Sequence, residues 1–515
     1  MMVFLLILIG GFFRFYNLDW GSPFYFHPDE RNIASSVLQI NFPNQMNPHF
    51  FAYGSFPIYL IYFTAFFLNL VSKSQLTFEQ ALIISRFYSA ILSVLLIPSI
   101  YYIGSKLANK NVGLIAAVFC TFSVGLIQFS HFGTFEIWLT FLGLWLFYFS
   151  LKLLKQLDFK DIITVGLISG LLAATKISSL PLLMIPMFSI LISYLSHNKL
   201  FKHILYGLSL IFISCILFYA VSPYVFLDTS SFIASMRHES SVALGTLSVF
   251  YTGGFFNSIP VIFQFTKIYP FLLNPALTIL FIPSLIYVIY FFLKKRHYPQ
   301  LLVVACFLLL FFSQAFLFAK WTRYILPTLP FVYLIIAIFI DKFINKKILQ
   351  IIFLICIVFS CSYFIDSFAR KDTRIQASLW AKENIPSSSR VLSEVYDLGI
   401  VPFNQYLPNI SLFNFYDLDQ TPDKPLELDK FLLESGYIIL PSQRIIQTRM
   451  MNKDEFPNGY KFYNELINEK LGYKKVYETS CDLFCKIIYL GDPVFSFEET
   501  ANVFDRPTVF IFKRM

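Results

Sequence analysis

The chain has 515 residues, of which 57% are hydrophobic, 19% aromatic and only 14% charged, and its formal net charge is +9. A mean hydropathy of +0.64 and repeated apolar runs of membrane-spanning length exclude an ordinary soluble protein and predict a multi-pass α-helical membrane protein. The positive charges are spread over short loops between apolar segments, a pattern that favours topology signals over a nucleic-acid surface, so no nucleic-acid partner is expected.

The first apolar segment is residues 2–16. Residues 1–13 have no basic start and no small-residue cleavage site, which predicts a retained span and not a removed signal peptide. Eleven further apolar segments follow, at 56–71, 82–105, 112–129, 137–154, 162–178, 180–196, 203–222, 270–293, 300–319, 323–340 and 348–366. Five basic clusters separate them, at Lys106/Lys110, Lys152/Lys155/Lys160, Lys199/Lys202, Lys294/Lys295/Arg296 and Lys342/Lys346/Lys347.

If all five clusters are cytoplasmic, segment 56–71 must begin and end outside. It is short, aromatic and opened by Pro57, so we interpret it as a re-entrant or interface-lying helix. About eleven spans result, with the N-terminus inside and everything after residue 366 outside the plasma membrane.

A polar cluster lies directly after the first segment. Pro28 stands where a helix could begin, and Asp29 and Glu30 would occupy its first turn, where the helix dipole favours anions. His27 precedes them and Arg31 follows. The next residues predict a short amphipathic helix, with Ile33, Val37 and Ile40 on one side. A capping cluster at a membrane surface is the simple interpretation, and a catalytic cluster is the other.

Three positively charged residues do not fit the rule that Lys and Arg lie on the cytoplasmic side. The same assignment places Lys176, Lys320 and Arg323 at or near the outer face. Each of them could extend toward the lipid headgroups. An anionic ligand bound at that face would explain all three together, since charges near the membrane are costly unless paired and mark substrate sites. Glu136, in the short turn that begins at Ser130, lies on this face as well.

Residues 367–515 are more charged and contain no run of membrane-spanning length, so we assign residues 1–366 to a transmembrane domain and 367–515 to a second, extracytoplasmic domain. The elements predicted in it are helices at 375–384 and 462–471 and strands at 390–394 and 437–441. Such alternation predicts a small α/β domain. Cys481 and Cys485 could form a disulfide in an oxidising compartment, and their spacing is poor for a zinc ribbon.

The polar landmarks occur in a fixed order along the chain. They are Pro28-Asp29-Glu30-Arg31, the Arg86 segment, Ser130-His131 through Glu136, Gly170 through Lys176, Ser222-Pro223-Tyr224 with Leu227-Asp228, Arg323-Tyr324 through Pro327, and Phe504-Asp505-Arg506-Pro507. This set resembles the membrane-embedded GT-C type glycosyltransferases of the protein O-mannosyltransferase and aminoarabinose-transferase kind, which are similar to glycosyltransferase family 39. One position departs from the family pattern, because Glu136 stands where the family usually has Asp.

The resemblance implies a transferase of the cell membrane that is mannosyltransferase-like. It would move a sugar from a polyprenyl-phosphate-linked lipid donor to an acceptor hydroxyl on the outer face, with inversion, and the acceptor could be a protein, a lipid or a glycan. Asp29 matches the catalytic position and would be the base that takes the acceptor proton. The full set of implied site residues is Asp29, Glu30 and Glu136 for catalysis, Lys176, Arg323, Arg31 and Arg86 for the donor phosphate, and His27, His131, Tyr224 and Tyr324 for the sugar and acceptor.

A lipid monophosphate is a stable anion that Lys and Arg can neutralise unaided, so we expect no cofactor and no essential metal. His27, Asp29, Glu30 and Glu136 could in principle bind one. Aromatic residues near the first loop (Phe24, Tyr25 and Tyr53) could stack on the sugar.

Two alternatives belong to other functional classes. A secondary transporter would show internal repeats and charges near the bilayer midplane, whereas this chain shows no repeat and places its polar residues at the ends of spans. A non-catalytic membrane scaffold would leave Asp29, Glu30 and the outer cations without a shared purpose. Sugar transfer that is lost in Asp29→Asn would separate the enzyme from both alternatives.

Overall fold

The computed structural model describes residues 1–197, 199–295, 298–480, 483–488 and 497–515, and in it the chain forms two units. The helical unit comprises 1–18, 29–244 and 272–360, and the α/β unit comprises 19–28, 245–271 and 361–515. The division predicted from the sequence, at 366/367, did not include the two internal segments. Residues 19–28 and 245–271 belong to the α/β unit because of their contacts with residues far along the chain, and no local sequence pattern predicts such contacts.

Long apolar helices make up most of the helical unit, and several shorter helices connect them. Up to residue 130 they are α1 (Met2–Phe15), α2 (Pro28–Leu38), α3 (Ser55–Ser72), α4 (Phe78–Leu107), α5 (Lys110–Thr121) and α6 (Val124–Ser130). They continue with α7 (Glu136–Lys155), α8 (Phe159–Thr175), the 3-10 helix η1 (Ile177–Leu183), α9 (Met184–His197), α10 (Leu200–Val221), α11 (Tyr224–Leu227) and α12 (Thr229–Leu244). The last are α14 (Pro275–Lys295), α15 (Tyr298–Ala315), α16 (Thr322–Ile325), η4 (Leu326–Thr328), α17 (Leu329–Phe343) and α18 (Lys346–Ser367).

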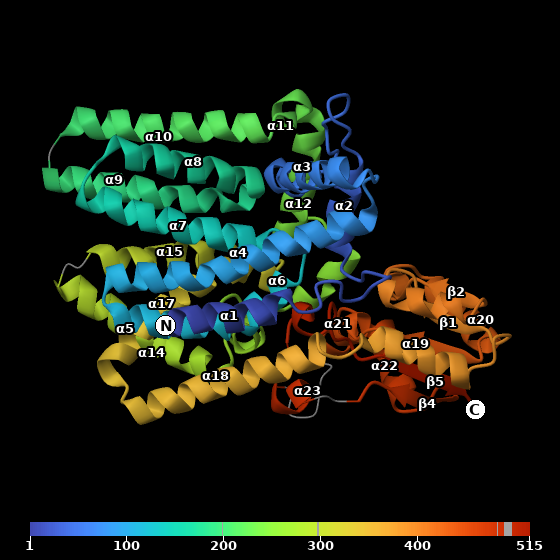
Figure 1. Cartoon of the computed structure of the whole chain (residues 1–515). Coiled ribbons are helices and arrows are strands. Elements are labelled where there is room, and N and C mark those ends of the chain that lie inside the picture. The colour runs from blue at the N-terminus through green and yellow to red at the C-terminus, as the bar shows by residue number, and fades with distance from the viewer. Residues whose placement is uncertain (198, 296–297, 481–482, 489–496) are drawn as a thin grey trace. The chain divides into compact units, whose positions relative to one another are not determined.

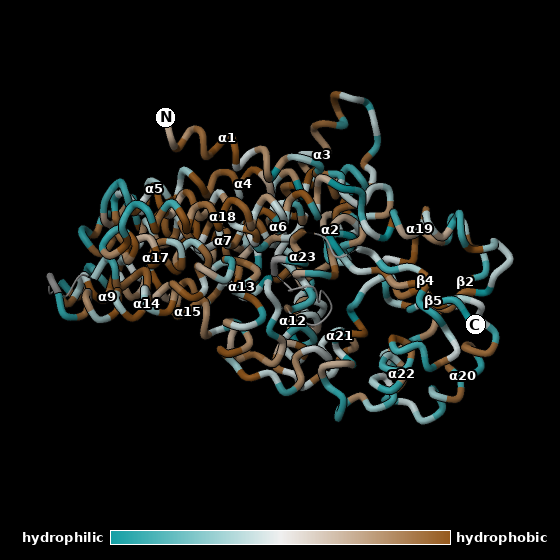
Figure 2. The backbone as a smooth tube through the Cα atoms, turned by 90° about the horizontal axis from the view of Figure 1, so that it is seen from below, coloured by the Kyte–Doolittle hydropathy of each residue, from teal (hydrophilic) through white to brown (hydrophobic). Residues whose placement is uncertain are grey.

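The predicted multi-pass architecture is confirmed. Within the described residues, nine helices are long and apolar enough to cross a membrane, or ten if α5 and α6 count as one span, and α1 is a shorter apolar helix. The set of helices long enough to span differs from the eleven spans predicted. Helix α8, which was predicted to span, has only 17 residues, whereas α3, which was predicted not to cross, has the required 18. The tube is brown along α4, α7, α14 and α17, as expected of helices that contact lipid or one another (Figure 2).

Helix α3 does not follow the direction of the long helices. It is seen nearly end-on in Figure 1, where α4, α7, α8 and α10 run across the view, and it runs across the bundle in Figure 2. This orientation supports the interpretation of segment 56–71 as an interface-lying helix. The sidedness of the membrane stays a prediction.

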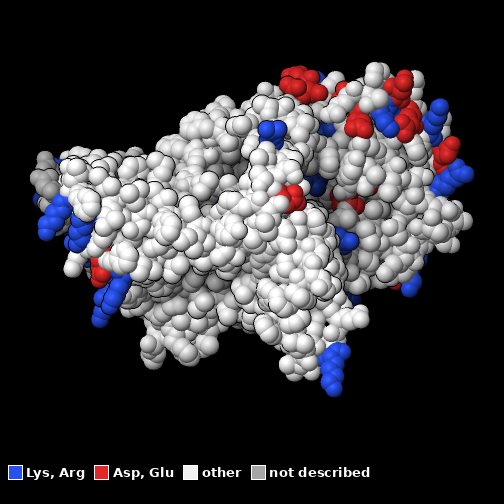
Figure 3. Space-filling model, turned by 90° about the horizontal axis from the view of Figure 1, so that it is seen from above, with Lys and Arg blue, Asp and Glu red and all other residues white. Residues whose placement is uncertain are grey.

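The five basic clusters adjoin the C-terminal ends of α4, α7, α9, α14 and α17, and these ends lie together at one end of the helical unit (Figure 1). Lys and Arg side chains gather there at the left of Figure 3, next to a broad surface that shows no charge. The start of α2 and the start of α7 lie toward the opposite end of the helical unit (Figure 1). Such an asymmetry is what the positive-inside pattern requires.

A buried arginine marks the break in the segment predicted at 112–129. Helices α5 and α6 are bent by 54° relative to each other, and Ser123 caps α6 by accepting a hydrogen bond from the Leu126 amide at 3.2 Å. Arg14 of α1 is fully buried and donates to the Cys120 and Thr121 carbonyls at 2.8 and 3.2 Å. It thereby satisfies backbone carbonyls that the end of α5 leaves without helical partners.

A five-stranded sheet forms the centre of the α/β unit. Its strands are β1 (Val391–Glu394), β2 (Ile410–Phe413), β3 (Tyr437–Leu440), β4 (Tyr473–Glu478) and β5 (Phe510–Arg514), in the order β2-β1-β3-β5-β4. Strand β1 pairs in parallel with β2 and β3, and β5 pairs antiparallel with β3 and β4. The connecting elements are η2 (Phe250–Phe255), the π-helical turn η3 (Gln264–Ile268), α13 (Tyr269–Leu272), α19 (Thr373–Asn384), η5 (Leu398–Gln405), η6 (Phe415–Asp419), α20 (Lys424–Glu434), α21 (Arg444–Met451), α22 (Pro457–Ile467), α23 (Leu483–Ile488) and η7 (Glu499–Ala501).

Both faces of this sheet are covered, because successive side chains along a strand point to opposite faces. Leu392 and Ile438 belong to a core shared with α21 and α22, whereas Val391 and Ile439 belong to a second core shared with α19. The fully apolar run of β3 fits a strand that is buried on both sides. The predicted α/β class of the C-terminal domain is therefore confirmed.

Two predictions for this unit need correction or lie outside the described residues. The helix predicted at 462–471 is α22, which begins earlier, at Pro457, and ends at Ile467. It cannot continue to 471, because Glu469 and Gly472 both have positive φ, a conformation that ends helices. The possible Cys481–Cys485 disulfide involves Cys481, which lies outside the described residues.

A buried carboxyl at the end of β1 makes the stability of the sheet depend on pH. Burial raises the pKa of Glu394 from 4.5 to about 7, although the amides of Tyr396 and Phe415 donate to it at 3.1 and 3.2 Å. A carboxyl whose pKa is raised by folding stabilises the fold when it is protonated. This stabilisation is complete at a pH below the pKa of the unfolded chain, and it is lost as the pH rises through the pKa of the folded chain. We expect the opening free energy of β1 to fall by up to about 3 kcal/mol between pH 4.5 and pH 8.

Hydrogen exchange of β1 peptides in the full chain, corrected for intrinsic rates, measures this slope. Glu394→Gln should flatten it, whatever its effect on the absolute stability. The matched control is Glu434→Gln on an exposed carboxylate, which should leave the slope unchanged. An equal slope in the wild type and Glu394→Gln would contradict the assignment.

Candidate active site

The first ion pair of the site joins the start of α2 to α16. Helix α2 begins at Pro28, as predicted, so Asp29 lies in the first turn, where the helix dipole favours its charge. Its Oδ2 accepts hydrogen bonds from Arg323 Nη1 and, at 3.1 Å, from the Tyr53 hydroxyl. The apolar side of α2 is buried through Ile33 and Val37, which fixes the helix against the bundle.

The second ion pair joins α7 to the break between α8 and η1. Glu136 is the first residue of α7, and its side chain is 2% exposed. Lys176 has an extended backbone after the last residue of α8, and its Nζ lies 3.3 Å from Glu136 Oε1. The break directs the lysine to the carboxylate, which a continuous helix through residues 162–178 would not do.

One cavity of about 380 Å³ brings these groups together. Glu136, Lys176, Arg323 and Tyr324 line it, which unites one predicted catalytic carboxylate, both principal phosphate-binding cations and one predicted pocket tyrosine. Lys176 Nζ lies 4.6 Å from the centre of the Tyr53 ring and 5.4 Å from that of Tyr324. Because Tyr53 also donates to Asp29, this one side chain contacts both ion pairs.

A glycine allows Tyr53 to reach this position. Gly54 packs against the end of α8, where its amide donates to the Thr175 carbonyl at 2.9 Å. A Cβ at position 54 would lie 1.9 Å from the Ala174 carbonyl oxygen. The φ of Gly54 is −76°, which any residue adopts, so close approach and not backbone strain demands glycine here.

Gly54→Ala should therefore separate Tyr53 from Lys176 and Asp29 and reduce turnover by about 10²-fold, the effect typical of misplacing a positioning group by about 1 Å. Sugar transfer per folded protein, measured after size-exclusion chromatography, checks this expectation. The control is Gly207→Ala in α10, where a Cβ meets nothing within 4 Å. Full activity in Gly54→Ala would show that the close approach is not needed.

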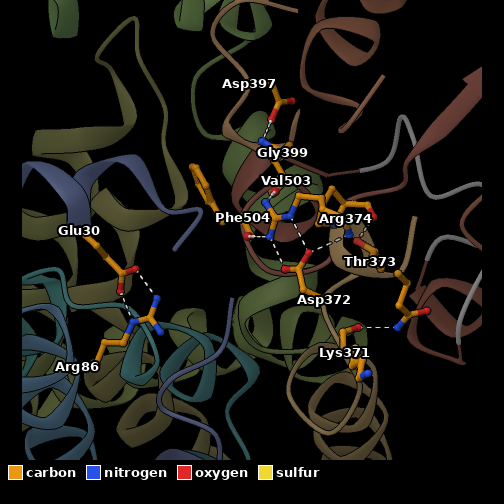
Figure 4. Close-up of polar contacts among 12 residues, drawn as sticks. Glu30, Arg86, Lys371, Asp372, Thr373, Arg374, Asp397, Gly399, Val503 and Phe504 are labelled. Atoms are coloured by element: carbon orange, nitrogen blue, oxygen red, sulfur yellow. Dashed lines mark hydrogen bonds and ion pairs between the residues drawn. The ribbon is translucent and has the colours of Figure 1, made fainter. Parts of the chain in front are cut away.

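Glu30, next to Asp29 in the chain, has a different environment. It is 2% exposed, and its carboxylate receives Arg86 Nε at 2.8 Å and Nη2 at 2.6 Å (Figure 4). The Gly133 amide donates to the same carboxylate at 2.5 Å, and Arg86 also donates to the Leu18 carbonyl at 2.7 Å. This buried pair holds α2, α4 and the turn before α7 together. We propose a positioning role for Glu30 and Arg86 in place of direct contact with the donor.

Three other predicted residues do not line the cavity. The Arg31 guanidinium lies over the Phe78 ring, 5.3 Å from its centre. His131 is fully buried, and its two ring nitrogens lie 2.9 Å from the Ile127 and Tyr16 carbonyls. Tyr224 begins α11 and does not line the opening. The structure thus brings together four of the eleven predicted residues around the cavity, and Asp29 through its partner Arg323.

His27 lies in the α/β unit, where its ring stacks on Phe504 with centres 4.5 Å apart. The neighbouring Phe26 ring faces the Arg374 guanidinium at 3.7 Å, and Arg374 donates to the Phe504 carbonyl at 2.7 Å (Figure 4). The Phe504-Asp505-Arg506-Pro507 ending, singled out from the sequence, therefore packs against the segment that leads into α2.

Sequence reasoning missed several polar residues of the cavity, namely Ser178, Ser179 and Gln314. An amide near the C-terminal end of the apolar helix α15 is a signal that could have identified Gln314, since polar groups within spans are costly and functional. No group of three or more His, Cys, Asp or Glu side chains suited to a metal ion occurs among the described residues. Metal-independent activity stays a prediction.

Solved structures share this fold. The chain matches ArnT from Cupriavidus metallidurans bound to undecaprenyl phosphate with a TM-score of 0.51 and 11% identity, over 88% of this chain and 94% of that chain. It matches the Archaeoglobus fulgidus oligosaccharyltransferase tethered with an acceptor peptide with a TM-score of 0.50 and 14% identity, over 100% of this chain and 88% of that chain. These similarities show the fold, which is that of the GT-C glycosyltransferases.

Residues 56–224 also match the family profile described as dolichyl-phosphate-mannose-protein mannosyltransferase. No curated protein matches the sequence. The family profile and the shared fold confirm the class predicted from the sequence, a membrane glycosyltransferase of the GT-C type.

Proposed function

We propose that this chain transfers a sugar from a polyprenyl-phosphate donor to an acceptor hydroxyl at the outer membrane face, with inversion at the anomeric carbon. The observation that carries the proposal is the pair of carboxylate–cation contacts Asp29–Arg323 and Glu136–Lys176. Glu136, Lys176 and Arg323 line one cavity, and Asp29 is joined to it through Arg323. The bound undecaprenyl phosphate in ArnT and the mannosyltransferase profile support a lipid phosphate donor and a mannose-like sugar.

The charges suit this reaction in a definite way. Lys176 and Arg323 would bind the donor phosphate and stabilise the negative charge that grows on the leaving oxygen. When Arg323 turns to the phosphate, Asp29 becomes available to accept the proton of the acceptor hydroxyl. The acceptor oxygen forms a bond to the anomeric carbon, the carbon–oxygen bond to the phosphate breaks, and the products are the glycoside and the polyprenyl phosphate.

The outer location follows from the same pattern. The carboxylate–cation pairs lie toward the end of the helical unit opposite the basic clusters, and those clusters are expected on the cytoplasmic side. We propose for this reason that the cavity lies on the extracytoplasmic side, and the sequence predicts the same side for residues 367–515.

The test uses the full chain in lipid nanodiscs with synthetic polyprenyl-phosphate donors that carry mannose, glucose or aminoarabinose. Acceptors are a Ser/Thr peptide, a lipid A-type glycolipid and an oligosaccharide. We expect acceptor-dependent release of polyprenyl phosphate with one donor, and a product whose anomeric configuration is opposite to that of the donor. Uptake of labelled solute without any transfer, or use of a nucleotide sugar in place of the lipid, would contradict the proposal.

A further inference from the structure

A second cavity lies wholly within the α/β unit. Its empty space, counted with the solvent at its mouth, is about 420 Å³. Its walls come from the internal segment 245–271, from α21 and from residues 497–499. None of the residues assigned to the membrane site takes part in it.

This cavity lies near the carboxyl ends of the parallel strands. Arg444, the first residue of α21, comes four residues after the end of β3. Phe250, next to the cavity residue Tyr251, stacks on Tyr396 beyond β1 at 4.4 Å and contacts Tyr416 beyond β2 at 4.8 Å. In open α/β sheets, ligands bind outside the carboxyl ends of the strands, where consecutive connections leave on opposite sides. Strand β1 lies between β2 and β3, so the sheet has such a point.

The charges around the cavity cancel. Arg444 Nε and Nη2 lie 2.9 and 3.3 Å from the two carboxylate oxygens of Glu499, and both side chains are less than a fifth exposed. Lys267 and Glu498 are the other charged residues of the lining, and the Glu498 amide donates to the Lys267 carbonyl at 3.2 Å. Burial lowers the pKa of Lys267. Two positive and two negative groups give no preference for an ion of either sign.

A buried amide oxygen points to a ligand. Gln447 lines the cavity and is 7% exposed. Its Nε2 donates to the Phe497 carbonyl, which fixes the orientation of the amide, whereas no described residue donates to its Oε1. An unsatisfied buried acceptor costs free energy, so a donor from a bound molecule would be stabilising at this position.

We propose that this cavity binds a sugar residue of a glycan, that is, a neutral ring rich in hydroxyl groups. The C–H face of such a ring packs on aromatic side chains, here Tyr251 and Phe497, while its hydroxyls exchange hydrogen bonds with planar groups such as those of Gln447, Arg444 and Glu499. The inference goes beyond the proposed function, because binding in the α/β unit does not require transfer at the membrane site.

Saturation-transfer NMR on the full chain in nanodiscs tests the proposal with methyl α-mannoside, methyl β-galactoside, sorbitol and inorganic phosphate at millimolar concentration. We expect binding of at least one glycoside and no binding of the open-chain sorbitol. Gln447→Leu should weaken that binding about threefold to tenfold, the effect of one hydrogen bond, and Tyr251→Ala should weaken it at least as much. Gln405→Leu, on an exposed glutamine of the same unit, is the matched control and should bind like the wild type.

Three results would overturn the assignment. They are the absence of glycoside binding to the wild type, equal binding in the wild type and both cavity variants, and binding of inorganic phosphate that the cavity variants lose. If Gln447→Leu fails to fold, Tyr251→Ala decides the outcome alone. Asp29→Asn should retain glycoside binding even though it lacks transfer, so the failure of one proposal is distinguishable from the failure of the other.

Discussion

Asp29→Asn should lower the turnover of sugar transfer by about 10²–10⁴-fold, the usual effect of removing a general base. Asparagine keeps the shape of the side chain and an oxygen that can accept from Arg323 and Tyr53, so the cavity should keep its geometry. Donor binding should therefore remain close to that of the wild type. Single-turnover kinetics with a synthetic donor, together with equilibrium binding of the same donor, separate these two quantities.

The control for this experiment is Asp341→Asn. Asp341 is the hydrogen-bond partner of Asn109 outside the cavity, and its substitution should leave transfer unchanged. Glu30→Gln is unsuitable as a control, since it would leave the buried Arg86 without its carboxylate and cost about 3–5 kcal/mol of stability. Retention of more than a tenth of wild-type turnover in Asp29→Asn would show that another group takes the proton.

Lys176→Ala should act first on donor affinity. The ammonium group would contact a phosphate that is present in both the ground state and the transition state, and a charge-assisted hydrogen bond of this kind contributes about 1.5–3 kcal/mol, or roughly 10- to 150-fold in binding. A further loss of rate is expected as negative charge grows on the leaving oxygen. Titration of the donor against the variant and measurement of transfer at saturating donor give the two effects separately.

Truncation of Lys176 also leaves Glu136 buried without its cation, which is a separate source of lost function. The double variant Lys176→Ala with Glu136→Gln removes that charge, so it isolates the contact to the donor. Lys176→Arg keeps the charge and should recover part of the affinity. Normal donor binding in Lys176→Ala combined with lost binding in Asp29→Asn would mean that the two roles are reversed.

The sequence could predict those parts of the site that depend on local order along the chain. Pro28 and the two acidic residues after it define the start of α2, and Glu136 stands at the start of α7 in the same way. Lys176 and Arg323 were identifiable because positive charges are unusual at span ends that the loop charges predict to be outer. Membrane spans are equally local, since their length and hydropathy appear in any sequence window.

Other parts depend on contacts between distant residues, which no local pattern reports. Asp29 and Glu30 are neighbours, but on a helix they point about 100° apart, so one meets Arg323 and the other meets the buried Arg86. Tyr53 was one of many aromatic residues in a chain with 63 Phe, and only the packing of Gly54 on α8 gives it a specific position. The antiparallel strand β5 at the end of the chain was not predicted either, because its pairing with β3 crosses about 70 residues.

The pairing of each cation with its own carboxylate has a kinetic consequence. Under the proposed function, a lipid phosphate that leaves the cavity would be replaced at once by Asp29 and Glu136, which are tethered beside Arg323 and Lys176 at a high effective concentration. The carboxylates would then compete with the spent carrier for the same cations and oppose inhibition by the product. A cavity with unpaired cations would bind the product more tightly and turn over more slowly, so the acidic partners would set the residence time of the carrier as well as the chemistry.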